Sequence, residues 1–205
     1  MGLALSALIM GLLVAPSASG VEPASEVGTP ATAGGVDFDY ADALSKSYKF
    51  YEAQRSGAHL PEYDWTVPWR QEAALTDGQD VGVDLSGGWF DAGDHVKFGL
   101  PMSYSATMLA WGLIEFPGAY SDAGVEPAAR DNLRFVLDYF LNAYDAGDPV
   151  DPSDDKLHYQ VGDGGADHGF WGPPEAMTMA RPTATCTAAS PCAEVAAGTA
   201  AALAA

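Results

Sequence analysis

A long stretch of the chain, residues 58–100, has no helical period. It carries many glycines, prolines and aspartates, which favour turns, and no run of apolar residues at a three- to four-residue spacing. Ordered loops of this length are uncommon inside a compact domain, and those that occur are often functional. The stretch therefore predicts a structured loop in which functional residues are to be sought.

Helical patterns flank this stretch on both sides. One helix is predicted from residue 37 to Gly57, a second follows Pro101, a third opens at Glu126, and a fourth starts near Ala193. The alternation of helix and loop suggests helical hairpins. The expected buried faces are Tyr40, Leu44, Tyr48 and Tyr51 in the first helix; Met102, Ala106, Leu109, Leu113 and Phe116 in the second; and Ala129, Leu133, Val136, Phe140 and Ala143 in the third.

Three further features follow from the pattern. Residues 156–163 alternate weakly between apolar and polar, so a short strand and an extended loop both remain open. Trp111 lies beside the apolar face of the second predicted helix, and we expect it in the core. The fourth helix has no glycine or basic residue at its C-terminal end. We therefore expect the chain to be the N-terminal part of a larger domain.

The first segment of the chain is predicted not to belong to the fold. Residues 1–15 are apolar and uncharged but shorter than the roughly 20 residues that a membrane-spanning helix needs. Small residues follow, so residues 1–20 are interpreted as a signal peptide, with a buried first helix as the alternative. Residues 21–35 form a predicted linker, and residues 36–205 form the predicted domain of a secreted, extracellular protein.

The charge balance excludes some classes of partner. Acidic residues outnumber basic ones 28 to 9, which gives a formal net charge of -19. Such a surface repels phosphate backbones and anionic lipids, so neither a nucleic acid nor a membrane is an expected partner. A neutral or cationic ligand fits better. Nothing in the sequence indicates an oligomeric state.

Metal-binding patterns are few. Cys186 and Cys192 are too few for a four-cysteine zinc site, and no segment fits the calcium loop of an EF-hand. No metal site is therefore predicted in these residues. The two cysteines are six apart in a chain expected to be exported, which is compatible with a small disulfide loop or with two free thiols.

The clearest chemical signal lies in residues 87–103, GGWFDAGDHVKFGLPMS. Two small residues separate Asp91 from Asp94 and allow a tight turn that aims both carboxylates at one point. Two carboxylates placed in this way can bind a metal, share a proton or hold a water molecule for attack, and the same spacing also occurs in purely structural turns. Trp89 and Phe90 add apolar faces, a mixture that suits a sugar ring and its hydroxyls.

Three segments resemble glycoside hydrolase family 9, the inverting cellulases. They are DYADALSKSYKFYEAQRSG (39–57), GGWFDAGDHVKFGLPMSYSATMLAWG (87–112) and VGDGGADHGFWGPPEAMTMARP (161–182), and they occur in the family's order. The resemblance implies an all-α fold, the (α/α)6 barrel, with only the first third or so in this chain. It also implies that the intact protein is an endo-β-1,4-glucanase, which hydrolyses internal bonds of cellulose or related β-glucans with inversion. No organic cofactor is implied, and structural calcium ligands would lie beyond residue 205.

The resemblance also implies roles for particular residues. Asp94 is expected to be the general base that takes the proton from the attacking water, and Asp91 is expected to bind and orient that water. His168 and Trp171 are expected to contact the substrate, Trp171 as a stacking platform. The family's general acid, a Glu, has no counterpart in the matching segments and is expected beyond residue 205. The 205-residue chain by itself is therefore expected to be inactive.

The chemistry of the residues agrees with this division of roles. The acid and base of an inverting glycosidase stand about 6.5–9.5 Å apart, with a water between them. Asp91 and Asp94 share one turn, so they fit a joint water-holding pair better than an acid and its base. Two alternatives stay open: a non-catalytic carbohydrate-binding protein, and a related barrel hydrolase acting on another glycan. The aspartate pair argues against the first, because binding alone needs no base.

Overall fold

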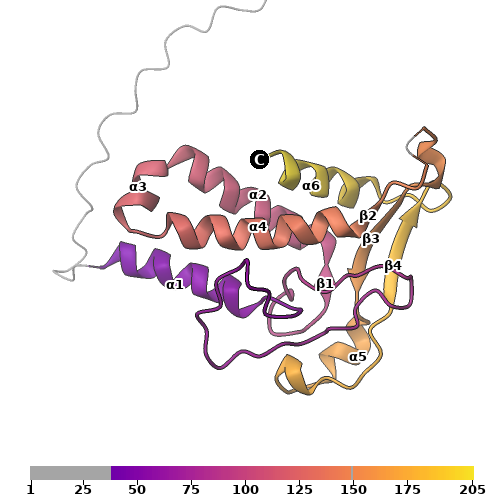
Figure 1. Cartoon of the computed structure of the whole chain (residues 1–205), viewed down its shortest axis with the longest axis horizontal. Helices are drawn as coiled ribbons and strands as arrows, with labels where there is room; N and C mark the ends of the chain where they lie inside the picture. Colours follow the sequence, from indigo (N-terminus) through magenta and orange to yellow (C-terminus); the bar gives the residue numbers. More distant parts are fainter. Residues whose placement is uncertain (1–37, 149) are drawn as a thin grey trace, which may run out of the picture. The chain divides into compact units, whose positions relative to one another are not determined.

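The computed structural model describes residues 38–148 and 150–205, which form helices and one small β-sheet (Figure 1). The predicted signal peptide and linker, residues 1–35, lie outside these described residues. The helices are α1 (Tyr40–Ala53), α2 (Gly99–Glu115), α3 (Pro117–Asp122), α4 (Glu126–Ala143), α5 (Gly164–His168) and α6 (Ala193–Ala204), with the 3-10 turns η1 (Pro152–Asp154) and η2 (Pro174–Ala176). The strands are β1 (Lys97–Phe98), β2 (Tyr144–Asp145), β3 (Lys156–Val161) and β4 (Thr183–Thr187).

Helix α4 supplies much of the core. It contacts α1, α2 and α6, and Figure 1 shows it running beside α2. Pro127 lies in its first turn, where a missing N–H costs no helical hydrogen bond. The five residues predicted for its inner face are all buried, namely Ala129, Leu133, Val136, Phe140 and Ala143. The periodicity of this segment therefore predicted both the helix and its orientation.

Three aromatic residues expected on buried faces are exposed instead. The exposed fractions are 66% for Tyr40, 55% for Trp111 and 65% for Phe116. Helix α2 buries Ala106 and Ala110, and Trp111 is the next residue, about 100° further around the helix. Its ring therefore points away from the covered face, and the prediction that it lies in the core is wrong. Tyr40 and Phe116 stand at helix ends, where the described residues cover them less.

The sheet corrects the all-α prediction. Strand β3 pairs antiparallel with β1, β2 and β4. Of the two alternatives for residues 156–163, the strand is confirmed as far as Val161. Strands β1 and β2 have only two residues each and leave no periodic signal in the sequence. The helices of the described residues do not close into a barrel (Figure 1).

The long loop between α1 and β1 is held by the core. Its side chains Tyr63, Leu85 and Trp89 are buried with residues of α2 and α4. Trp65 packs against the same core, whereas Trp69 is 70% exposed. The loop is therefore ordered by apolar burial, although it carries no helix.

Arg55 links three parts of the structure. It follows α1 and is fully buried, and its guanidinium forms an ion pair with Asp131 of α4 at 2.7 Å. It also donates hydrogen bonds to Asn132 Oδ1 at 3.1 Å and to the Asp64 carbonyl at 2.8 Å. Arg55 therefore fixes the end of α1 against α4 and the long loop.

A disulfide joins Cys186 of β4 to Cys192, the residue before α6, so free thiols are excluded for this pair.

The register of the sheet places the aspartate turn next to a helix. It pairs Lys97 with Val161. Asp94 precedes Lys97 by three residues and α5 follows Val161 by three, so this pairing brings the aspartate turn beside α5.

Candidate active site

The turn that carries Asp91 and Asp94 is closed by its own hydrogen bonds. The Asp91 N–H donates to the Val96 carbonyl at 3.0 Å, and the Ala92 N–H donates to Asp94 Oδ1 at 3.3 Å. From the end of α1, Gln54 Nε2 donates to the Ala92 carbonyl at 2.9 Å. The backbone that carries both carboxylates is therefore fixed from within the turn and from the end of a neighbouring helix.

Asp94 contacts a histidine that is 74 residues away in the sequence. Its Oδ2 lies 2.8 Å from Nε2 of His168, the last residue of α5. The Asp94 side chain is 11% exposed, whereas that of His168 is 63% exposed. A nearly enclosed carboxylate thus meets an accessible imidazole, and both oxygens of that carboxylate have a polar neighbour.

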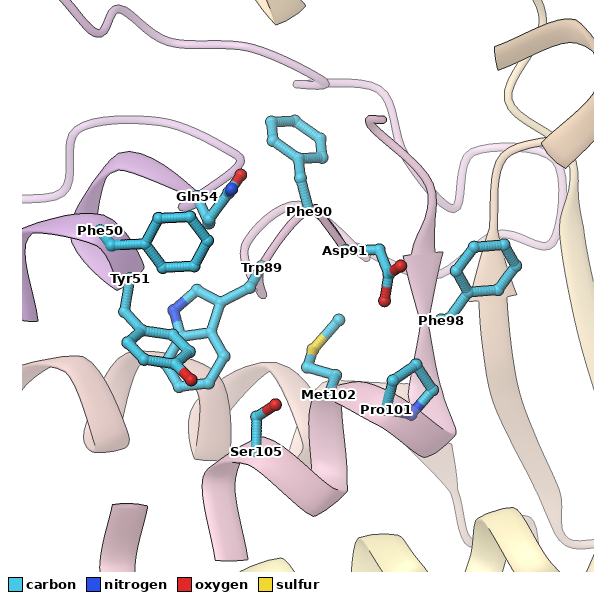
Figure 2. Close-up of a pocket in the computed structure, with 10 residues that line it drawn as sticks. All are labelled: Phe50, Tyr51, Gln54, Trp89, Phe90, Asp91, Phe98, Pro101, Met102 and Ser105. Atoms are coloured by element: carbon cyan, nitrogen blue, oxygen red, sulfur yellow. The ribbon is translucent and has the colours of Figure 1, made fainter. Parts of the chain in front are cut away.

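Asp91 stands between two cavities. One, of about 120 Å³, is lined by aromatic and apolar side chains, and Figure 2 shows the Asp91 carboxylate pointing into it on the side of Phe98, Pro101 and Met102. Burial raises the pKa of Asp91, the negative charge of Asp94 raises it further, and His168 lowers it. A negative charge on Asp91 is therefore less favourable than on a carboxylate in water, because it is partly buried and lies near the charge of Asp94.

The second cavity brings the predicted site residues together. It has a volume of about 460 Å³ and is lined by both aspartates, His168 and Trp171, with Phe170 and Asp167 beside them. Trp171 is 95% exposed. An exposed indole next to polar groups offers a flat apolar face to a ligand that also needs hydrogen bonds. A sugar ring has both requirements.

Asp167 lines this cavity, and His95, the residue after Asp94, packs beside it. His95 is buried and lies edge-on to the rings of Phe90 and Phe170, at centroid distances of 5.4 Å and 5.7 Å. Burial lowers the pKa of His95. These contacts give His95 a packing role behind the aspartate turn. Asp167 lies in the same matching segment as His168, but nothing in the sequence marks it as buried, since acidic residues are usually exposed.

Two other functional expectations concern metals and membranes. The described residues contain no group of three or more His, Cys, Asp or Glu side chains that could hold a metal ion. Calcium ligands were expected beyond residue 205, so that expectation stays a prediction. Within residues 38–148 and 150–205, none of the helices combines the length and the apolar character that crossing a membrane requires.

Comparisons with known proteins place the chain among the glycosyl hydrolases. The model of glycosyl hydrolase family 9 matches residues 40–205, which is most of the chain. The chain therefore belongs to glycosyl hydrolase family 9. The family expected from the three sequence segments is thus confirmed.

Its relatives are endoglucanases. Endoglucanase B of Cellulomonas fimi is 54% identical over 198 residues, which are 97% of this chain and 17% of that protein. The structure of an endoglucanase from the termite Nasutitermes takasagoensis superposes with a TM-score of 0.74 at 48% identity, over 82% of this chain and 37% of that one. Endoglucanase CelQ from Clostridium thermocellum, complexed with cellobiose and cellotriose, superposes with a TM-score of 0.67 at 42% identity, over 82% and 25%. The chain thus spans well under half the length of each of these relatives.

Proposed function

We propose that the complete protein is an endo-β-1,4-glucanase that hydrolyses internal bonds of cellulose or related β-glucans with inversion. The observation that carries the proposal is the placement of Asp91, Asp94, His168 and Trp171 around one open cavity, in a chain of family 9. Relatives named endoglucanases, one of them bound to cellobiose and cellotriose, support the substrate class. A neutral glucan also suits a protein with a net charge of -19.

In this proposal Asp94 is the general base. A water molecule held by Asp91 and Asp94 attacks the anomeric carbon, and Asp94 takes its proton while the bond to the leaving oxygen breaks. A general acid on the opposite side of the sugar gives a proton to that oxygen. His168 holds Asp94 through its 2.8 Å contact and faces the cavity, where it can bind a sugar hydroxyl. Trp171 supplies the stacking surface.

The general acid is proposed to lie outside residues 1–205. Two glutamates in or just after the matching segments are engaged elsewhere: Glu175 forms an ion pair with Arg70, and Glu115 accepts a hydrogen bond from the Trp111 indole at 3.2 Å. The short coverage of the relatives supports the same conclusion. We therefore expect the purified 205-residue chain to show no turnover of carboxymethylcellulose, and turnover like that of a full-length relative would contradict this expectation.

The complete domain is proposed to be the (α/α)6 barrel. Large apolar side chains of α2 are exposed in the described residues, among them Met108 at 46%, Trp111 at 55% and Ile114 at 59%. Such a stripe on a helix is normally covered by another element. Further helices of a longer domain would cover it, and would supply the calcium ligands expected beyond residue 205. Secretion into an extracellular medium, where cellulose is found, completes the proposal.

The test is substitution of each aspartate in the complete protein. Asp94→Asn keeps the size of the side chain but removes the proton acceptor, and general-base catalysis is worth about 10²–10⁴-fold in rate. We expect kcat on carboxymethylcellulose to fall by at least that factor while cellotetraose binding, measured by calorimetry, changes little. Asp91→Asn should slow turnover less. If neither variant loses turnover, the turn is structural and the proposed function of these residues is wrong.

A further inference from the structure

Asp167 joins the two segments that carry the predicted catalytic base and its histidine. Its side chain is 1% exposed, and its Oδ1 accepts a hydrogen bond from the His95 N–H at 2.8 Å. His95 directly follows Asp94, and His168 directly follows Asp167. One buried hydrogen bond therefore fixes the backbone on which Asp94 stands relative to the backbone on which His168 stands.

The carboxylate of Asp167 belongs to a buried chain of four charges. Its Oδ2 lies 3.6 Å from Arg181 Nη1. Arg181 binds both carboxylate oxygens of Asp77, at 2.7 Å and 3.1 Å, and Asp77 forms an ion pair with Lys97 at 2.7 Å. The four side chains are each 10% exposed or less. Two acids and two bases balance, so each buried charge has a partner of opposite sign.

Lys97 connects the chain of charges to the residues that precede the aspartate turn. Its Nζ donates hydrogen bonds to the Gly87 carbonyl at 3.0 Å, to the Leu85 carbonyl, and to Ser56 Oγ at 3.2 Å. The segment from Leu85 to Lys97 contains both Asp91 and Asp94. Lys97 binds the carbonyls at the start of this segment, and Asp167 binds the His95 N–H near its end. Asp77 and Arg181 connect Lys97 to Asp167.

We propose that Asp167 is a positioning residue for the reaction, which sets the distance between Asp94 and His168 through the His95 N–H. This inference rests on the proposed function of Asp94. Asp167 itself does not act on the water or the sugar, because its carboxylate is turned to the backbone of His95 and to Arg181. Errors of about 1 Å in the placement of a catalytic group can cost about 10²-fold in rate.

The experiment compares three variants of the complete protein. Asp167→Ala removes the acceptor for the His95 N–H, and we expect kcat per folded molecule to fall about 30- to 100-fold with KM within about twofold. Asp167→Asn keeps an acceptor oxygen but loses the charge, and we expect a smaller fall. Asp163→Asn is the matched control, because Asp163 is an exposed cap of the same helix that an asparagine can replace. It should leave both constants unchanged.

Two readouts separate positioning from a merely structural role. The fall is expected in kcat per folded molecule with KM nearly unchanged, whereas a variant that is only less stable would keep the kcat of its folded molecules. Amide hydrogen exchange should show that the His95 N–H loses protection in Asp167→Ala and keeps it in Asp163→Asn.

Several results would overturn the proposal. These are an unchanged kcat per folded molecule, a loss confined to KM, or unchanged protection of the His95 amide. If the unsubstituted protein fails to hydrolyse β-glucans, the proposed function is wrong. The exchange measurement then still decides whether Asp167 holds the aspartate turn.

Discussion

Replacing Lys97 by methionine would test the buried charges beneath the aspartate turn. Lys97→Met keeps most of the side-chain volume but removes the ion pair with Asp77 and the hydrogen bonds to the Leu85 and Gly87 carbonyls. Removing one partner of a buried ion pair costs about 3–5 kcal/mol. Arg181 still holds Asp77 through two hydrogen bonds, so we expect a loss near the lower end, about 3 kcal/mol in the free energy of unfolding.

The assay is urea unfolding of the complete protein, followed by tryptophan fluorescence. Lys46→Met is the matched control, because Lys46 forms an ion pair with Asp42 while its side chain is 72% exposed. Exposed pairs of this kind contribute little, so the control should unfold like the unsubstituted protein. Equal unfolding free energies for Lys97→Met and Lys46→Met would refute the reasoning.

The pH dependence of unfolding, compared between the unsubstituted protein and Lys97→Met, gives a second check. Burial lowers the pKa of Lys97 from 10.5 to about 8. Between these two values the unfolded chain binds more protons at this lysine than the folded one, so this group makes stability rise with pH. The difference in unfolding free energy between the unsubstituted protein and Lys97→Met should therefore widen from pH 8 to 10, by about 1.4 kcal/mol per pH unit at most. A difference that shrinks over this range would contradict the buried, low-pKa lysine.

Three further substitutions test the geometry of the loop and the sheet. Gly88 has a φ of +71° and an added Cβ would lie 2.8 Å from the Tyr139 ring, so Gly88→Ala should lower the unfolding free energy by about 2–4 kcal/mol. Gly82→Ala, with φ +74° and open space around it, should cost only about 1–2 kcal/mol, and equal losses would rule out the contact with Tyr139. Cys186→Ser opens a loop closed by residues six apart and should cost about 2 kcal/mol, with no further loss on adding a thiol reductant. A reductant effect that persists in Cys186→Ser would show that another group responds.

The buried face of a helix was predictable from the sequence where other described elements cover that face. The inner face of α4 follows the apolar period residue by residue, because α1, α2 and α6 surround it. The period of α2 gave the helix but not the position of Trp111. An apolar residue beside the buried face looks the same in the sequence whether or not a neighbouring element covers it. Strand β1, with two residues, is defined only by its pairing with β3.

The sequence predicted which residues belong to the candidate site, but not which of them contact one another. Asp91 and Asp94 are marked by their spacing, and His168 and Trp171 by a motif resemblance. The contact between Asp94 and His168 depends on the pairing of Lys97 with Val161. No local sequence pattern predicts that pairing. Asp167 was missed because acidic residues are rarely buried, so a sequence reading places them at the surface.

The most direct test of Asp94 as the base of an inverting reaction is the product that the complete protein with Asp94→Ala makes in the presence of azide. Azide takes the place of the attacking water, forms the bond to the anomeric carbon as the glycosidic bond breaks, and needs no base. The proton for the leaving oxygen still comes from the general acid. With a soluble cello-oligosaccharide as substrate, we predict restored turnover and an α-glycosyl azide, identified by the anomeric signal in proton NMR. A β-glycosyl azide, or restored turnover in Asp91→Ala but not in Asp94→Ala, would contradict the account.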